Sequence, residues 1–457
     1  MNSLATIFFL AAAVALMIVP RRLAVVPLLV GCTYMTMAQG IKIGPASLPI
    51  YRMLLLVGVI RVCLRSERLP GKMNLIDLLM IGWGLWVIFC SMFHDQSRAG
   101  IVYACGIAFN QILFYFLIRI WCVDLNEVTY VLCMVALLLI PIAFEMIYEK
   151  YVGKNLFSSF GGVPNHVLIR EGSLRAQGPF RHPILAGTVG ATCLPLFIGI
   201  FKTHPNKAVV GIIAALVITL TSASSGPVMS TLAGLGAIIL FRHRAYVPTI
   251  KMGAVGLYVI LMLTMSKPPY YLISKIDISG GSTGWHRSYL IEQTFKHLSE
   301  WWAFGTDETR HWMPNQGFAL DPHHTDITNI YIGFGVTAGV LGLIFFTWIM
   351  WTAFCWVGKV CEMLSPKDMS MVFLVWCIGS SLFAHAVTGL SVAYFDQSII
   401  FLWLNIAVVS SVFSSGSMNT SRRYANNPAT TMKSSNMQRT LFTMGVSNSQ
   451  IIFDSNA

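Results

Sequence analysis

Apolar segments separated by short polar turns follow one another along almost the whole chain. Thirteen of them approach the roughly 20 residues that a helix needs to cross a bilayer, at positions 4–19, 23–38, 49–63, 75–93, 101–121, 128–147, 183–201, 209–221, 227–241, 250–265, 330–354, 369–385 and 398–412. Two long polar loops interrupt this series. The pattern predicts an all-α, polytopic integral membrane protein with about 12–13 transmembrane helices.

Basic residues indicate which ends of these segments face the cytoplasm. The short loops on one side hold Arg21, Arg22, Arg61, Arg65, Arg68, Lys72, Lys202, Lys207, Arg242, Arg244, Lys359 and Lys367. The short loops opposite contain little beyond Lys42 and Arg98. The positive-inside rule makes the first side cytoplasmic and places the two long loops, 148–182 and 266–329, in the periplasm.

The first segment has no basic residue before it and is followed by Pro20, Arg21 and Arg22, the reverse of the charge order of a secretory signal. It is expected to be an uncleaved anchor with its N-terminus outside. Transmembrane helices are then expected in 1–147, 183–265 and 330–412, with the two periplasmic loops between them. The tail 413–457, rich in Ser, Asn and Thr, is expected to be a disordered cytoplasmic extension.

Composition supports the membrane class and argues against nucleic acid as a partner. The chain is 55% hydrophobic and only 11% charged, far from the roughly 25% charged residues of soluble domains. Its net charge of +12 comes from cations in short loops beside apolar segments, where membrane topology explains them. The ten cysteines lie within or next to apolar segments without CxxC or Cys/His ligand spacing, which favours packing roles and argues against a structural zinc site.

One pair of segments, 209–221 and 227–241, is short for a membrane span, so their connecting turn is expected below the outer surface. The turn holds Ser224, Ser225 and Gly226 before Pro227, with Ser225 or Gly226 suited to the N-cap and Pro227 to the first turn of a helix. A helix N-terminus at this depth is a natural anion site. An ordinary tight turn between packed helices is an equally good interpretation.

Both long loops carry arginines close to the membrane. Arg170, Arg175 and Arg181 lie in a loop shaped by glycine and proline. Guanidinium groups bind phosphate bidentately, so this loop suits a phosphate-bearing substrate; lipid-headgroup contact is the alternative. In the second loop, residues 285–298 have the pattern of a helix lying at the interface. Arg287 is expected to face a substrate there.

The second loop ends in Asp321-Pro322-His323-His324-Thr325-Asp326, directly before the next span. An imidazole has the pKa to take a proton from a hydroxyl group near neutral pH, and a carboxylate such as Asp326 could orient it. Inert loop histidines are the competing interpretation. A divalent metal on these residues is a weaker one, because no recognised ligand spacing is present.

With these features, the chain resembles the O-antigen ligase and polysaccharide polymerase family of bacterial inner membranes over residues 145–342. The resemblance rests on a basic outer loop, a Ser-rich hairpin, and a large loop ending in His324, followed by Gly335 and Gly339 within a helix. Arg175, Arg181 and Arg287 align with the family's phosphate-binding arginines. The chain departs from the family at Thr325 and in the hairpin turn, where the family often has arginine.

The resemblance implies transfer of a glycan from undecaprenyl diphosphate to an acceptor hydroxyl on the periplasmic face, with His324 and Asp326 as catalytic residues and no metal or other cofactor. It implies as partners the lipid-linked glycan, an acceptor glycan or lipid, membrane lipids, and proteins that regulate chain length or export. An exopolysaccharide or O-antigen polymerase is preferred to a ligase. The rival of another class is a lipid-linked oligosaccharide transporter, against which no internal repeat is visible.

The glycines after His324, namely Gly333, Gly335 and Gly339, also have a structural interpretation. Small residues let neighbouring helices approach closely. We therefore expect them to hold the histidine-bearing end of their helix in place.

Overall fold

The computed structural model describes residues 1–94, 97–275, 284–314, 323–364 and 368–425. Its main elements are α1 (Ser3–Ile18), α2 (Val25–Tyr34), α3 (Ile50–Leu64), α4 (Leu75–Cys90), α5 (Ser97–Trp121), α6 (Leu125–Val152), α7 (Pro183–Gly199), α8 (Pro205–Thr221), α9 (Ser225–Ile239), α10 (Val247–Thr264), α13 (Ile330–Met363), α14 (Met369–Gly389) and α15 (Ile399–Ala425). Each of the thirteen predicted segments overlaps one of these helices. The chain is therefore an all-α membrane protein, as predicted.

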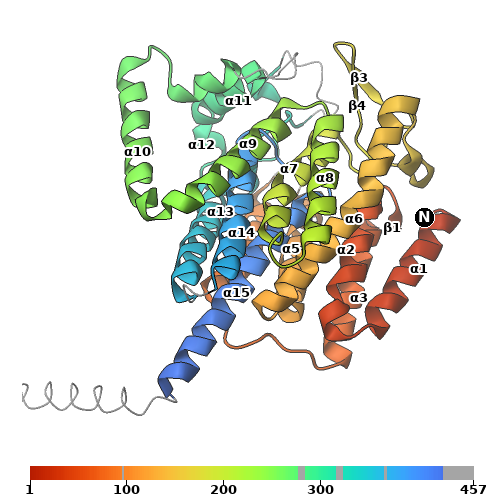
Figure 1. The fold of residues 1–457 in the computed structure, drawn as a ribbon. Coiled ribbons are helices and arrows are strands. Elements are labelled where there is room, and N and C mark those ends of the chain that lie inside the picture. The colour runs from red at the N-terminus through yellow and green to blue at the C-terminus, as the bar shows by residue number, and fades with distance from the viewer. Residues whose placement is uncertain (95–96, 276–283, 315–322, 365–367, 426–457) are drawn as a thin grey trace, which may run out of the picture.

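The elements between these helices are short. Figure 1 shows the two-stranded hairpins β1–β2 and β3–β4 and the small helices α11 and α12 at the edge of the bundle. Their bounds are β1 Gly40–Ile43, β2 Ala46–Pro49, β3 Leu168–Arg170, β4 Ser173–Arg175, α11 Gly284–Lys296 and α12 Leu298–Trp301. The 3-10 turns are η1 Arg21–Leu23, η2 Ser91–Phe93, η3 Leu156–Phe160, η4 Leu240–Tyr246, η5 Pro269–Lys275 and η6 Arg310–Trp312.

Seven helical segments of the described chain are long and apolar enough to cross a membrane, one of them formed by α9, η4 and α10 together. Helices α1, α7 and α8 are apolar but shorter. The ten residues of α2 extend only about 15 Å at a rise of 1.5 Å per residue, half the thickness of the hydrocarbon layer. Length and composition thus support fewer complete crossings than the 12–13 expected from hydropathy.

Helix α7 forms the centre of the bundle and packs against α8, α9 and α14. Nearly all of its side chains are buried. Glycines permit the close approach of α8: a Cβ on Gly190 would lie 2.5 Å from the Ala215 carbonyl oxygen. This packing brings the start of α7 beside the turn between α8 and α9.

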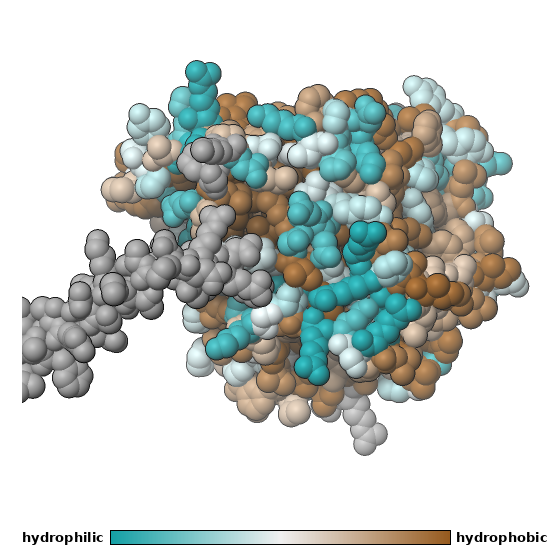
Figure 2. Space-filling model, turned by 60° about the horizontal axis from the view of Figure 1, so that its bottom comes forward, coloured by the Kyte–Doolittle hydropathy of each residue, from teal (hydrophilic) through white to brown (hydrophobic). Residues whose placement is uncertain are grey.

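The two ends of the bundle differ in chemistry. At one end, the Asn2 side chain donates a hydrogen bond to the Ser159 carbonyl at 2.9 Å, so the N-terminus lies with the first long loop. At the other end, Arg21 donates to Ile120 O at 3.0 Å and Arg61 pairs with Glu67 at 2.8 Å. Figure 2 shows hydrophilic side chains gathered on this second end. We call the first end the loop face and the second the basic face.

Two elements extend beyond the central bundle. Helix α10 has no buried residue and stands apart from the other helices in Figure 1, as suits an apolar helix covered by lipid. Helix α15 continues to Ala425, past position 412 where the last span was expected to end. The remainder of the expected tail, 426–457, lies outside the described residues.

Candidate functional site

The hairpin β3–β4 in the first long loop places two arginines on the loop face. Strand β3 ends at Arg170, which pairs with Ser173, and β4 ends at Arg175. The two residues between the strands, Glu171 and Gly172, both have positive φ, at 47° and 77°. A two-residue turn of this kind matches the twist of the flanking strands and fixes their register.

Arg175 docks onto the turn between α8 and α9. Its Nη2 donates to Ser224 Oγ at 2.7 Å, and its Nε lies 3.4 Å from the Ser222 carbonyl oxygen. The next amide, that of Ala176, donates to Thr221 O at 3.1 Å. Arg175 is only 6% exposed. Burial, together with the nearby charge of Arg170, lowers its pKa to about 10, which still leaves the side chain charged at neutral pH.

Helix α9 begins one or two residues earlier than expected. Ser224 is its N-cap, Ser225 and Gly226 lie buried in the first turn, and Pro227 lies in that turn as predicted. The expected N-cap at Ser225 or Gly226 was therefore wrong by one or two positions. Ser224 Oγ donates to Ser222 O at 2.9 Å and accepts from Arg175, and it makes no capping bond to the helix. The positive end of the helix dipole thus adds to the charge of Arg175.

Arg287 reaches the same region from α11. It is half-buried, and its pKa is lowered by burial and by the charge of Arg170, while Asp326 acts in the opposite direction. Its Nε atom is buried and has no hydrogen-bond partner in the described part of the chain. Arg170 influences both Arg175 and Arg287. We call Arg170, Arg175 and Arg287 the arginine cluster.

His182 borders the arginine cluster and was not among the predicted site residues. It caps α7, where its Nδ1 accepts a hydrogen bond from the Ile184 amide at 3.1 Å. Burial and the charges of Arg175 and Arg170 lower its pKa to about 4. The ring is therefore neutral near pH 7, with its proton on Nε2 available for donation. The signal in the sequence was a histidine directly before the proline that starts α7.

The predicted catalytic residues lie at the end of the second long loop. His324 and Asp326 are exposed, and the irregular segment that carries them is held by hydrogen bonds to neighbouring residues. The amides of Thr309 and Arg310 donate to His323 O, each at 2.9 Å, and the Thr325 amide donates to Thr309 Oγ1 at 3.0 Å. This pairing holds His324 at the edge of the membrane helices.

Asp326 acts on α11. Its carbonyl oxygen lies 3.2 Å from His286 Nε2, and its charge favours the protonated forms of His286 and Arg287. It therefore offsets part of the positive charge of the arginine cluster. The adjacent His323 lies 2.5 Å from a carboxylate oxygen of Glu308. Asp321, the other acid of the predicted histidine motif, lies outside the described residues.

Arg181 contacts another element. Its amide donates to Asp396 Oδ2 at 2.9 Å, and its charge lowers the pKa of this buried carboxyl group, which burial raises. The structure thus places Arg181 beside the segment between α14 and α15. Arg175 docks on the turn between α8 and α9, and both Arg175 and Arg287 are influenced by the charge of Arg170.

Two glycines of α13, Gly335 and Gly339, lie where the second loop packs against this helix. Gly335 packs beneath the ring of Trp301, which a Cβ would approach to 2.7 Å. Helix α13 is interrupted at Ala338 and Gly339, where Gly339 has a φ of 71°. At this break, a backbone amide of the helix bonds to the loop instead: the Val340 amide donates to Trp302 O at 2.8 Å. Gly335 therefore has the expected close contact, Gly339 forms a helix break, and a Cβ on Gly333 would meet no neighbour.

These residues form a cationic site at the loop end of α7 and α9. The charge of three arginines, a neutral imidazole and the N-terminus of α9 suit a multivalent anion. No protein-family model matches the chain, and no curated protein is recognisably similar to it in sequence.

Proposed function

We propose that the chain is a membrane glycosyltransferase that moves a glycan from undecaprenyl diphosphate to an acceptor hydroxyl at the loop face. The observation that carries this proposal is the arginine cluster beside the N-terminus of α9. It also accords with the family resemblance of residues 145–342. In this proposal the protein lies in a bacterial inner membrane and its loop face is periplasmic.

The charge of the cluster favours a diphosphate over a singly charged anion. The charge of Arg170 repels that of Arg175 and lowers the tendency of Arg175 to hold its proton, and Arg287 experiences the same repulsion. A ligand with two or more negative charges relieves this repulsion and replaces lost hydration. Its polyprenyl tail can lie along the apolar helices that surround the site.

The proposed reaction needs two kinds of residue. The arginine cluster stabilises the negative charge that develops as the bond between the sugar anomeric carbon and the diphosphate oxygen breaks. The acceptor oxygen forms the new bond to that carbon from the opposite side, which inverts its configuration. His324 takes the proton of the acceptor hydroxyl, and Asp326 stabilises the positive charge that this transfer produces nearby.

The test replaces the native gene with His324→Ala, His323→Ala or Arg287→Ala and measures polysaccharide yield, chain length and carrier-linked glycan. His166→Ala, an exposed histidine of the first loop, is the matched control. With normal protein levels, His324→Ala and Arg287→Ala are expected to abolish polymer while glycan repeats accumulate on the carrier at the loop face. His323→Ala and the control are expected to make polymer at the normal yield.

The products distinguish the alternatives. Loss of chain extension with intact transfer to other acceptors indicates a polymerase, and loss of transfer of a finished chain to a lipid acceptor indicates a ligase. Full-length polymer at normal yield in His324→Ala contradicts the proposed role of this histidine. Accumulation of the lipid-linked glycan on the basic face instead would favour a transporter.

A further inference from the structure

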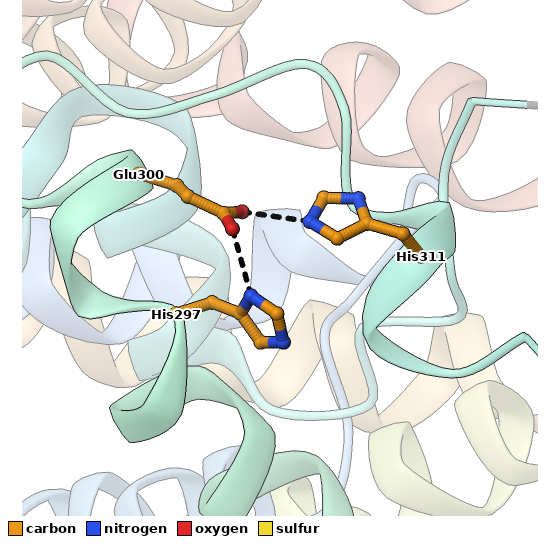
Figure 3. Close-up of side chains that lie close together, drawn as sticks. All are labelled: His297, Glu300 and His311. Carbon is orange, nitrogen blue, oxygen red and sulfur yellow. Dashed lines mark hydrogen bonds and ion pairs between the residues drawn. The ribbon is translucent and has the colours of Figure 1, made fainter.

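A cluster of two histidines and one glutamate lies elsewhere in the second long loop. His297 caps α12, Glu300 lies within this helix, and His311 lies in η6. His297 Nδ1 is 2.7 Å from Glu300 Oε1, and His311 Nε2 is 2.9 Å from Glu300 Oε2. Figure 3 shows both rings turned toward the carboxylate. We propose that these three side chains bind a Zn²⁺ ion.

The ligand atoms lie near enough to one another for small side-chain rotations to bring them onto one metal ion. One atom from each residue falls within 4.8 Å of the other two. Zinc binds imidazole nitrogen and carboxylate oxygen at roughly 2.0–2.2 Å, so small side-chain rotations bring all three atoms into its coordination sphere. Two histidines and a glutamate are an established ligand set for zinc, with water in the remaining position.

A buried tryptophan orients these ligands. Trp312 donates from Nε1 to Glu300 Oε2 at 2.8 Å, and its ring stacks on His297 with centroids 5.5 Å apart. Trp312 is almost fully buried, so it is a fixed platform. Hydrogen bonds of this kind to a ligating carboxylate set its orientation and raise metal affinity.

The site is open to metal and water. The exposed fractions of the side chains are 26% for His297, 36% for Glu300 and 52% for His311. Two imidazolium groups could also pair with one carboxylate without metal, but exposed ion pairs contribute little stability. A metal ion bound here uses the neutral imidazoles and joins them through stronger bonds.

A bound metal ion would connect two parts of the second loop, α12 and η6. Residues 297–300 and 311 flank a segment that is bonded to α13: the Thr306 amide donates to Val336 O at 2.8 Å. The same segment leads to Thr309, whose amide donates to His323 O. Zinc would therefore stabilise the part of the loop that carries His323 and His324. This stabilising role does not depend on the proposed transfer reaction.

The test uses the full chain, purified in detergent without an affinity tag, and Co²⁺ as a spectroscopic substitute for Zn²⁺. One equivalent of Co²⁺ is expected to give visible absorption bands of four- or five-coordinate cobalt, which Zn²⁺ then displaces. Glu300→Gln and His311→Gln are expected to lose these bands. His204→Gln, an exposed histidine outside the cluster, is expected to retain them.

A second variant examines the orienting contact. Trp312→Phe keeps an aromatic ring and removes the hydrogen bond to Glu300, so metal affinity is expected to fall by about tenfold or more. Chelator is expected to lower the unfolding temperature of the wild-type protein and to leave that of Glu300→Gln unchanged. Absence of cobalt bands in the folded wild-type protein, or equal bands in Glu300→Gln and His311→Gln, would overturn the proposal.

Discussion

At the scale of single residues, His182 couples the bundle to pH. Its pKa is about 4 in the folded protein against 6.5 for an ordinary histidine. The unfolded chain therefore binds more protons between these values, and stability falls as pH decreases from 6.5 toward 4. The shift corresponds to at most about 3 kcal/mol.

The variant His182→Asn tests this dependence. Asparagine is a good N-cap, so it retains the hydrogen bond to the Ile184 amide and removes the titrating ring. We expect a flatter dependence of the unfolding temperature on pH between 6.5 and 4, measured in detergent. An unchanged dependence would show that other groups cause it.

Ser224 is the second residue whose contact can be tested. It accepts the hydrogen bond of the buried Arg175 Nη2 group. Ser224→Ala leaves that donor without its partner and is expected to reduce the free energy of unfolding by about 1–3 kcal/mol. Thr264→Ala is the control, because its hydroxyl donates to Ile260 O within its own exposed turn. Equal losses in the two variants would argue against the importance of the Arg175 contact.

At the scale of elements, the break in α13 requires glycine. Gly339 combines a φ of 71° with a ψ of −177°, a region of backbone space that is essentially restricted to glycine. A Cβ there would also lie 2.2 Å from the Ala303 carbonyl oxygen. Gly339→Ala is therefore expected to destabilise the loop attachment by more than about 2 kcal/mol.

Gly333→Ala, in the same helix, is the matched control. A Cβ at this position would meet no atom within 4 Å, and alanine favours a helix over glycine by about 0.5–1 kcal/mol. Thermal unfolding should rank Gly333→Ala at or above the wild-type protein and Gly339→Ala well below it. The reverse order would refute the assigned role of the break.

At the scale of the whole molecule, the two faces predict opposite exposure across the membrane. Cys63 is exposed near the basic face, and Ile169 in β3 is 68% exposed on the loop face. We expect a membrane-impermeant maleimide to label Ile169→Cys in intact spheroplasts. Cys63 should react only after the membrane is permeabilised. Labelling in the opposite order would reverse the proposed orientation.

The fold was largely predictable because a long apolar segment in lipid satisfies its own backbone hydrogen bonds only as a helix. Backbone groups in lipid must be satisfied within helices, so long apolar segments such as 75–93 and 330–354 indicate helices directly. Their correspondence with α4 and α13 follows from this constraint. The number of complete crossings was less certain because hydropathy does not measure helix length, as the ten-residue α2 shows.

By itself, the sequence determined the helical class, the order of the helices, and the arginines and histidines of the two long loops, since these depend on local composition and period. The tertiary structure decided which of them meet. Arg175 is hydrogen-bonded to Ser224 and lies near the charge of Arg170, which also acts on His182. Arg181 instead contacts Asp396. The tertiary structure also assembled His297, Glu300 and His311. Contacts between distant segments depend on helix packing and loop docking, which no local pattern encodes.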